Sequence, residues 1–220
     1  MKGGRRVVIL AAGKKERAQF YRSFLRSGDI LLCADGGAME ARKIGVVPDA
    51  VIGDFDSFEG KIPPSWKATR FLKFPCEKDK TDLELALDEA FDVNPDEILI
   101  VGGLGGRLDH SLANILLLSK GLERGVRIRL ISEEVEVLLL KRGEARISGK
   151  PGELISLIPF SEKVSGIDLE GFRYVMKKGE LSFGSTRGIS NELAASEGII
   201  SIASGLLLVV KFRENGRDQE

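Results

Sequence analysis

Histidine, cysteine and aromatic residues are scarce in this sequence of 220 residues. It contains 1 His, 2 Cys and 1 Trp, and aromatic residues make up 6% of it. Cys33 and Cys76 lie far apart, and neither has His or Cys neighbours at the spacing of metal ligands. The sequence therefore gives no indication of a zinc site or a disulfide framework, and it fits a reducing compartment.

Net charge and long apolar runs are missing as well. Lys and Arg together number 33 and so do Asp and Glu, so no overall charge draws the chain to nucleic acid or to an anionic membrane. The apolar run at 7–12 is too short for a signal peptide, and no stretch approaches the length that spans a bilayer. We therefore expect a cytoplasmic globular protein that binds neither nucleic acid nor membranes.

Strand and helix patterns alternate over roughly the first 135 residues. Residues 81–91 predict an amphipathic helix that starts with a capping box, because Glu84 follows Thr81 by three positions. A second helical pattern, 109–125, stops at a glycine. Apolar, β-branched runs between the helical patterns predict buried strands at 7–12, 30–34, 50–52, 98–101 and 127–131. This order predicts an α/β domain over residues 1–135, with a mostly parallel sheet flanked by helices.

The pattern changes after residue 135 to short strand-like runs separated by glycine turns. These runs lie at 135–140, 144–148, 153–159, 198–203 and 206–212. Alternating apolar runs bounded by turn residues are typical of β-structure. We therefore expect a second, β-rich domain over residues 136–220.

Aspartates follow several predicted strands at the end where ligands bind in open α/β sheets. Taken alone, the pair Asp54 and Asp56 is equally compatible with a solvated loop, and Asp82 with the favourable charge at a helix start. Several carboxylates around one cleft, however, require cations, and Mg²⁺ prefers carboxylate and water oxygens. The candidate cluster consists of Asp35, Asp54, Asp56, Asp79, Asp82 and Asp109.

The stretch GGLGGRLDH, residues 102–110, predicts a phosphate-binding loop. Its glycines, Gly103, Gly105 and Gly106 among them, let backbone N–H groups approach an anion, and the following helix offers its positive N-terminus. Arg107 can donate a fork of hydrogen bonds to phosphate oxygens. His110, the only histidine, fits a polar residue at the helix start better than a general base, because no nucleophile motif accompanies it.

The order of these motifs resembles the thiamine pyrophosphokinase family over nearly the whole chain. The motifs are CADGGA, PDAVIGDFDS, EKDKTDLELAL, GGLGGRLDH and FGSTRGISNEL. The resemblance implies an α/β nucleotide-binding domain, a C-terminal β-sandwich, and a homodimer whose thiamine sites lie between two subunits. It also implies transfer of the pyrophosphoryl group of ATP to the hydroxyethyl oxygen of thiamine, giving thiamine diphosphate and AMP.

The resemblance assigns roles to residues. It implies that Mg²⁺ is bound by Asp54, Asp56, Asp79, Asp82 and Asp109. It also implies that the catalytic residues of pyrophosphoryl transfer are Asp54, Asp56, Asp82, Arg107 and Asp109. One of these aspartates could accept the alcohol proton. ATP binding is implied for Asp35, Gly36, Gly37, Gly103, Gly105, Gly106, Arg107 and His110. Thiamine binding is implied for Ser190, Asn191 and Tyr174, the last as a stand-in for a tryptophan that some relatives carry.

Two other functions fit part of this pattern. A related pyrophosphokinase acting on a hydroxymethyl pterin would keep the aspartates and the phosphate loop without needing GISNEL. A non-catalytic module that senses a nucleotide or thiamine diphosphate would keep the fold and lose the carboxylates. Here GISNEL is present and every carboxylate is intact, so the thiamine enzyme is favoured.

Overall fold

The computed structural model describes residues 4–55 and 62–213. The chain divides into two compact units, residues 1–132 and 133–220. The first combines a parallel sheet with helices and the second is rich in strands, so the predicted fold class is confirmed. Among the described residues, no helix has the length and apolar character needed to cross a membrane.

The first unit is built on a parallel sheet whose strand order is β6-β5-β1-β2-β3-β4. From β1 the chain adds strands toward one edge as far as β4, and it then returns to the other side of β1 to add β5 and β6. The order therefore reverses between β1 and β5, and a ligand crevice is expected at the carboxyl ends of these strands. The strand bounds are β1 (Arg6–Leu10), β2 (Ile30–Ala34), β3 (Ala50–Gly53), β4 (Arg70–Lys73), β5 (Glu97–Val101) and β6 (Arg127–Ile131).

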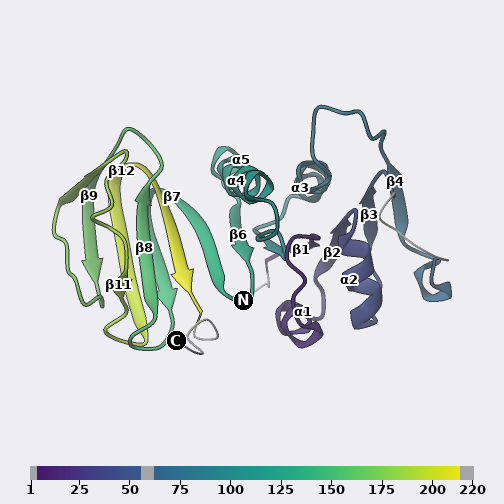
Figure 1. The fold of residues 1–220 in the computed structure, drawn as a ribbon, viewed down its shortest axis with the longest axis horizontal. Helices are drawn as coiled ribbons and strands as arrows, with labels where there is room; N and C mark the ends of the chain where they lie inside the picture. Colours follow the sequence, from purple (N-terminus) through teal and green to yellow (C-terminus); the bar gives the residue numbers. More distant parts are fainter. Residues whose placement is uncertain (1–3, 56–61, 214–220) are drawn as a thin grey trace. The chain divides into compact units, whose positions relative to one another are not determined.

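Helices cover both faces of this sheet. Helices α1 (Ala18–Phe24) and α2 (Gly37–Ile44) lie on one face, and α3 (Asp82–Asp92), α4 (Leu108–Leu116) and α5 (Leu118–Arg124) lie on the other (Figure 1). A short 3-10 helix, η1 (Pro64–Trp66), precedes β4. Burial on both faces explains why the central strands read as continuous apolar runs in the sequence.

The capped helix predicted at 81–91 is confirmed as α3. The Thr81 side chain accepts a hydrogen bond from the Glu84 backbone N–H at 3.2 Å and so caps the helix. The pattern at 109–125, expected as one helix, forms α4 and α5, which meet at Leu117. Its stop at Gly125 is confirmed, because this glycine adopts the left-handed conformation that ends helices, with φ of 68°.

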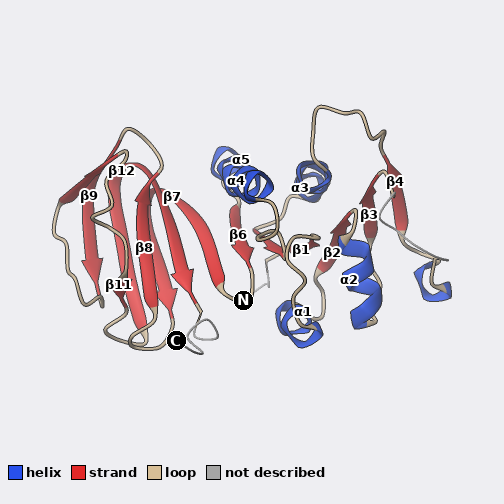
Figure 2. Cartoon of the chain, viewed as in Figure 1, coloured by secondary structure: helices blue, strands red, loops and turns tan. Residues whose placement is uncertain are grey.

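The second unit consists of strands joined by loops in its described part (Figure 2). Its longest strand, β12, pairs with β7 on one side along its length. On the other side, the first half of β12 pairs with β9 and the second half with β8. Apolar side chains from these strands form a separate core. The bounds are β7 (Val135–Ser148), β8 (Leu154–Pro159), β9 (Lys163–Glu170), β10 (Gly179–Ser182), β11 (Asn191–Glu192) and β12 (Glu197–Phe212).

Two pairs of predicted strands are in fact single strands. The runs 135–140 and 144–148 join as β7, and 198–203 and 206–212 join as β12. Gly143 and Gly205 have positive φ angles of 122° and 91°, and the β12–β7 register shifts between Ile202 and Leu206. The glycines that signalled turns in the sequence therefore mark an irregularity inside continuing strands.

Candidate active site

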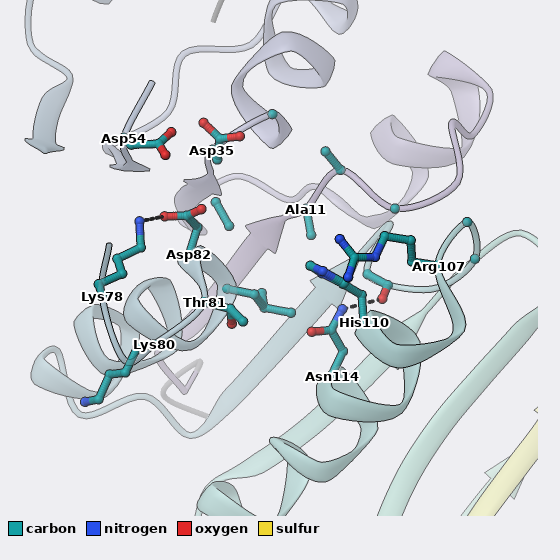
Figure 3. Close-up of a pocket in the computed structure, with 18 of the residues that line it drawn as sticks. Ala11, Asp35, Asp54, Lys78, Lys80, Thr81, Asp82, Arg107, His110 and Asn114 are labelled. Atoms are coloured by element: carbon teal, nitrogen blue, oxygen red, sulfur yellow. Dashed lines mark hydrogen bonds and ion pairs between the residues drawn. The ribbon is translucent and has the colours of Figure 1, made fainter. Parts of the chain in front are cut away.

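A cavity of about 580 Å³ lies at the carboxyl ends of the parallel strands, within the size range of small-molecule sites (Figure 3). Its walls come from the loops after β1, β2, β3 and β5, from the segment before α3, and from the first turns of α3 and α4. The lining residues are Ala11, Ala12, Gly13, Ala34, Asp35, Gly36, Asp54, Cys76, Lys78, Lys80, Thr81, Asp82, Leu83, Gly103, Gly105, Gly106, Arg107, His110 and Asn114.

Three carboxylates face this cavity from separate elements. Asp35 follows β2, Asp54 follows β3, and Asp82 opens α3. The first two strand ends lie very close, since a Cβ atom added at Gly53 would be 3.0 Å from the Asp35 Cβ. Figure 3 shows Asp82 on the same side of the cavity as Asp35 and Asp54. Negative charge is therefore concentrated at one wall of the cavity, called the acidic wall below.

Lys78 lies among these carboxylates. Its ammonium nitrogen is 2.8 Å from Asp82 Oδ1, and the Lys78 side chain is only 15% exposed. Partial burial opposes the charged form, but the hydrogen bond to Asp82 and the charges of Asp82 and Asp54 outweigh it and raise the pKa of Lys78. This lysine supplies a positive charge at the acidic wall of the cavity.

Lys80 also lines the cavity but is paired elsewhere. Its ammonium nitrogen lies 2.6 Å from Asp88 Oδ2, and Figure 3 shows it pointing away from the carboxylates. Lys78 and Lys80 are two residues apart, carry the same charge and differ in their partners. They form a matched pair for testing the acidic wall.

The opposite wall is the glycine-rich loop that follows β5. Gly105 and Gly106 have positive φ angles of 85° and 75°, which glycine adopts without strain. Two side chains of α4 brace the loop: Asn114 Nδ2 donates to the Gly103 carbonyl at 2.7 Å, and Ser111 Oγ accepts from the Gly105 N–H at 3.1 Å. The loop therefore has a defined conformation beside the N-terminus of α4.

The loop after β1 is joined to the glycine-rich loop by backbone hydrogen bonds. The Gly13 N–H donates to the Gly102 carbonyl at 2.7 Å, and the Lys14 N–H donates to the Leu104 carbonyl at 2.9 Å. A Cβ atom at Gly13 would lie 2.6 Å from both carbonyl oxygens, so this close approach requires glycine. Strand β1, predicted to reach Ala12, ends at Leu10, and the chain then enters this loop contact.

Arg107 and Asp109 form an exposed ion pair at the rim. Arg107 donates to both carboxylate oxygens of Asp109, at 3.1 and 2.5 Å. Asp109 Oδ1 also accepts from the His110 backbone N–H at 2.9 Å. The hydrogen bond from Arg107 lowers the pKa of Asp109 to about 2, and the same pair raises the pKa of Arg107. Asp109 is therefore ionised near neutral pH and fixes the direction of the guanidinium.

The structure brings together many, though not all, of the candidate residues. Gly37 packs against the end of β1, where an added Cβ would lie 2.0 Å from the Leu10 carbonyl oxygen, so its role is to let α2 approach the sheet. Asp79 and Asp109 are exposed and outside the lining, and Asp56 lies outside the described residues. The candidates that line the cavity are Asp35, Gly36, Asp54, Asp82, Gly103, Gly105, Gly106, Arg107 and His110.

The lining also contains residues that the motifs did not single out. Lys78 lies inside EKDKTDLELAL and lines the cavity. The sequence motif indicates only the aspartates next to it as site residues. Asn114 lies one helical turn after His110, a spacing that places both on one helix face and could have revealed it. Within 4–55 and 62–213, no group of three or more His, Cys, Asp or Glu side chains is arranged to hold a metal ion.

The thiamine-side candidates lie in the second unit. Tyr174 is largely exposed (58%), and Ser190 is exposed as well. Asn191, by contrast, is only 6% exposed, and its side-chain amide is hydrogen-bonded to the backbone of Tyr174. The three residues therefore differ in what they offer a ligand: a ring and a hydroxyl are accessible, whereas the amide is turned into the protein.

Both units match models of one protein family. Residues 21–130 match the model described as thiamin pyrophosphokinase, catalytic domain, and residues 142–207 match the one described as thiamin pyrophosphokinase, vitamin B1 binding domain. The first match contains the described wall of aspartates and the glycine-rich loop. The second contains Tyr174 and Asn191.

Individual relatives agree with these matches over nearly the full length. The chain is 37% identical to a thiamine pyrophosphokinase of Bacillus subtilis (strain 168) over 206 residues, which is 92% of this chain and 96% of the relative. The crystal structure of the Bacillus subtilis thiamine pyrophosphokinase superposes with a TM-score of 0.88 at 34% identity, covering 96% of this chain and all of that one. A Geobacillus thermodenitrificans structure of the same description gives 0.81 at 29% identity, with 96% and 99% covered.

Proposed function

The chain belongs to the thiamine pyrophosphokinase family, whose members are transferases that use ATP, and we propose that its α/β unit carries out the transfer. The enzyme moves the pyrophosphoryl group of ATP to thiamine, giving thiamine diphosphate and AMP. The observation that supports the site is the cavity at the strand ends, which has carboxylates on one wall and a glycine-rich loop with Arg107 on the other.

ATP phosphates fit the wall formed by the glycine-rich loop. Backbone N–H groups at a helix N-terminus and an arginine are the usual ligands of phosphate oxygens. Arg107 lines this wall and is paired with Asp109 at the rim through Nε and one terminal nitrogen, which leaves its other terminal N–H groups for phosphate oxygens. Gly36 and Asp35 border the same cavity at the end of β2, where the nucleoside is expected.

The carboxylate wall has the donor chemistry of a magnesium site. Asp54 and Asp82 supply hard oxygen ligands that face one cavity, and Asp56 follows Asp54 by two positions. We expect Mg²⁺ to be held there together with ATP oxygens and to neutralise negative charge on the phosphates. The two other aspartates of the proposed set, Asp79 and Asp109, contribute only if they turn toward the cavity.

The chemistry is a displacement at the β-phosphorus of ATP. The thiamine hydroxyl oxygen forms a bond to this phosphorus while the bond to the α,β-bridging oxygen breaks, and the electron pair leaves with AMP. A carboxylate facing the cavity takes the hydroxyl proton. The walls bring nucleophile and leaving group into line, which is the main source of rate in phosphoryl transfer.

The thiamine side of the reaction is assigned to the β-rich domain over residues 136–220, and ATP binding to residues 1–135. Tyr174 offers an exposed aromatic face for the thiamine rings, and Ser190 offers a hydroxyl. We further propose a homodimer with thiamine sites between the subunits and a cytoplasmic location, the latter because the chain has only 2 Cys and both are free thiols. Light scattering at micromolar concentration should then give about twice the chain mass of 24.0 kDa.

One assay separates this function from its rivals. The protein is incubated with ATP and Mg²⁺, together with either thiamine or a hydroxymethyl pterin, and AMP is measured. AMP with thiamine alone supports the proposal. AMP with the pterin alone indicates the related pyrophosphokinase, and binding of nucleotide without AMP from either alcohol indicates a sensing module.

A further inference from the structure

A short antiparallel pairing joins two loops in the second unit. Phe172 and Leu193 form an isolated bridge, and the Arg173 N–H donates to the Glu192 carbonyl at 2.9 Å. The chain segments 172–174 and 191–193 therefore run side by side in opposite directions. One residue further along, at Tyr174, the pairing continues in a different way.

At Tyr174, the side chain of Asn191 takes the place of a partner backbone. The Tyr174 N–H donates to Asn191 Oδ1 at 3.0 Å, and Asn191 Nδ2 donates to the Tyr174 carbonyl at 2.8 Å. Asn191 Oδ1 also accepts from the Glu192 N–H at 2.8 Å. A carboxamide has the same donor and acceptor as a peptide group, so it can extend a ladder by one step.

These hydrogen bonds commit the amide to the protein. Asn191 is 6% exposed, and its backbone belongs to β11, paired with Ile155 of β8. The Asn191 Oδ1 already accepts two hydrogen bonds and Nδ2 already donates one, so a ligand that took over these positions would leave buried backbone groups of Tyr174 and Glu192 without partners. Asn191 is therefore suited to holding Tyr174, not to touching the substrate.

The ring that Asn191 supports is open to a ligand. The Tyr174 side chain is exposed, while the Arg173 guanidinium lies 5.5 Å from the ring centroid and forms an ion pair with Glu192 at 3.1 Å. The ring is thus fixed at its backbone by Asn191, with the Arg173–Glu192 pair beside it. An aromatic residue whose backbone is already held loses less entropy when a flat heterocycle stacks on its ring than one on a loose loop.

We propose that Asn191 is a positioning residue that acts on thiamine binding through Tyr174, whose ring makes the contact. This inference rests on the proposed function, since it takes thiamine as the ligand of the second unit. It differs from a direct contact between the Asn191 amide and a thiamine ring, which the family resemblance alone suggested. Both ideas predict weaker thiamine binding when Asn191 is lost, so a test must separate them.

A double-mutant cycle makes this separation. The KM values for thiamine and ATP and the melting temperature are measured for wild type, Asn191→Ala, Tyr174→Ala and the double variant. Each single change should raise the thiamine KM by about 10-fold with less than about a twofold change for ATP. The double variant should match Tyr174→Ala within about twofold, because Asn191 has no ring left to position.

The contrary result is equally clear. If the two effects on the thiamine KM multiply, Asn191 contacts thiamine independently and the proposal is overturned. Ser190→Ala serves as the comparison in the Tyr174→Ala background, where a separate hydroxyl contact should give multiplying effects. The stability loss from Asn191→Ala should be the same with and without the Tyr174 ring, because it comes from the backbone hydrogen bonds.

A second variant protects the test against a folding defect in the first. Asn191→Asp keeps the acceptor for the Tyr174 and Glu192 N–H groups, replaces the donor to the Tyr174 carbonyl by a carboxylate oxygen and adds a negative charge, so its melting temperature is measured alongside. If Asn191→Ala does not fold, Asn191→Asp replaces it in the same cycle with the same two outcomes. Failure of wild type to form AMP with thiamine would reject the proposed function itself, a result distinct from multiplying effects in an active enzyme.

Discussion

The two units handle polar side chains in opposite ways. In the α/β unit, Asp54, Asp82 and Lys78 face an open cavity, with charges that a ligand can neutralise or exchange. In the β-rich unit, the buried amide of Asn191 is hydrogen-bonded to backbone groups and the accessible group is the Tyr174 ring. A polar residue in a binding motif can therefore serve either the ligand or the framework, and the hydrogen-bond partners decide which.

The largest expected effect tests whether the charges of the first unit serve a ligand. Asp54→Asn should reduce turnover by at least about 100-fold, equivalent to about 2.7 kcal/mol of transition-state stabilisation. The metal-free variant should melt near the wild-type temperature, because the substitution relieves repulsion from neighbouring carboxylates and also removes the attraction of Asp54 for Lys78. Melting curves with and without Mg²⁺ and ATP, together with AMP formation, measure both effects.

Asp88→Asn is the matched control for this change. Asp88 is paired with Lys80 at 2.6 Å and lies outside the cavity lining. Its loss should leave turnover per folded molecule near normal and cost at most about 1 kcal/mol of stability. If Asp54→Asn is instead destabilised but active, Asp54 has a structural role and does not bind a metal. The polar side chains of the two units would then not differ in function.

An intermediate effect is expected from the contact between two loops. Gly13→Ala would place a methyl group 2.6 Å from the carbonyl oxygens of Gly102 and Leu104, so the glycine-rich loop must shift. The KM for ATP should rise by about 10-fold, with a smaller change for thiamine. Lys15→Ala, at an exposed position two residues later, should change neither value. An unchanged ATP KM in Gly13→Ala would show that the phosphate site does not depend on this contact.

The smallest effect concerns the cation at the acidic wall. Lys78→Met should lower the stability of the metal-free protein by about 1 kcal/mol or less, since the pair with Asp82 is partly exposed. Mg²⁺ alone should then raise the melting temperature of the variant more than that of wild type, because no ammonium competes for Asp82. Lys80→Met removes the same charge from a different partner, so its response to Mg²⁺ should equal that of wild type.

Much of the first unit follows from the sequence because its signals are local. Five strands and the capped helix were predicted close to their observed bounds, since apolar runs and Thr81 with Glu84 carry the information within a few residues. Strand β4, with the sequence RFLK, was missed because an edge strand buries little and has no continuous apolar run. The loop contact at Gly13 joins residues about ninety positions apart, which no local pattern records.

Roles at the site were harder to predict than positions. The sequence indicates that Asn191 carries an amide, but its partner lies 17 residues earlier and is a backbone group. Asp109 was predicted as a metal ligand, and the structure adds a partner that the sequence did not indicate, because its carboxylate is paired with Arg107; its role as a ligand stays a prediction. Asp79 belongs to the same motif as Asp82, yet only Asp82 lines the cavity; Asp79 is exposed in the segment before α3, whereas Asp82 is the first residue of that helix.

The central place of β12 in the second unit has a consequence for how the chain becomes structured during synthesis. This strand contributes Ile200, Ile202, Leu207 and Val209 to the core, and it pairs with β7, some sixty residues earlier. The core can therefore not close until residues 197–212 have left the ribosome, whereas the first unit has all its strands by Ile131. Since non-local pairing is slow, the second unit should fold late and spend longest exposed to aggregation and proteolysis.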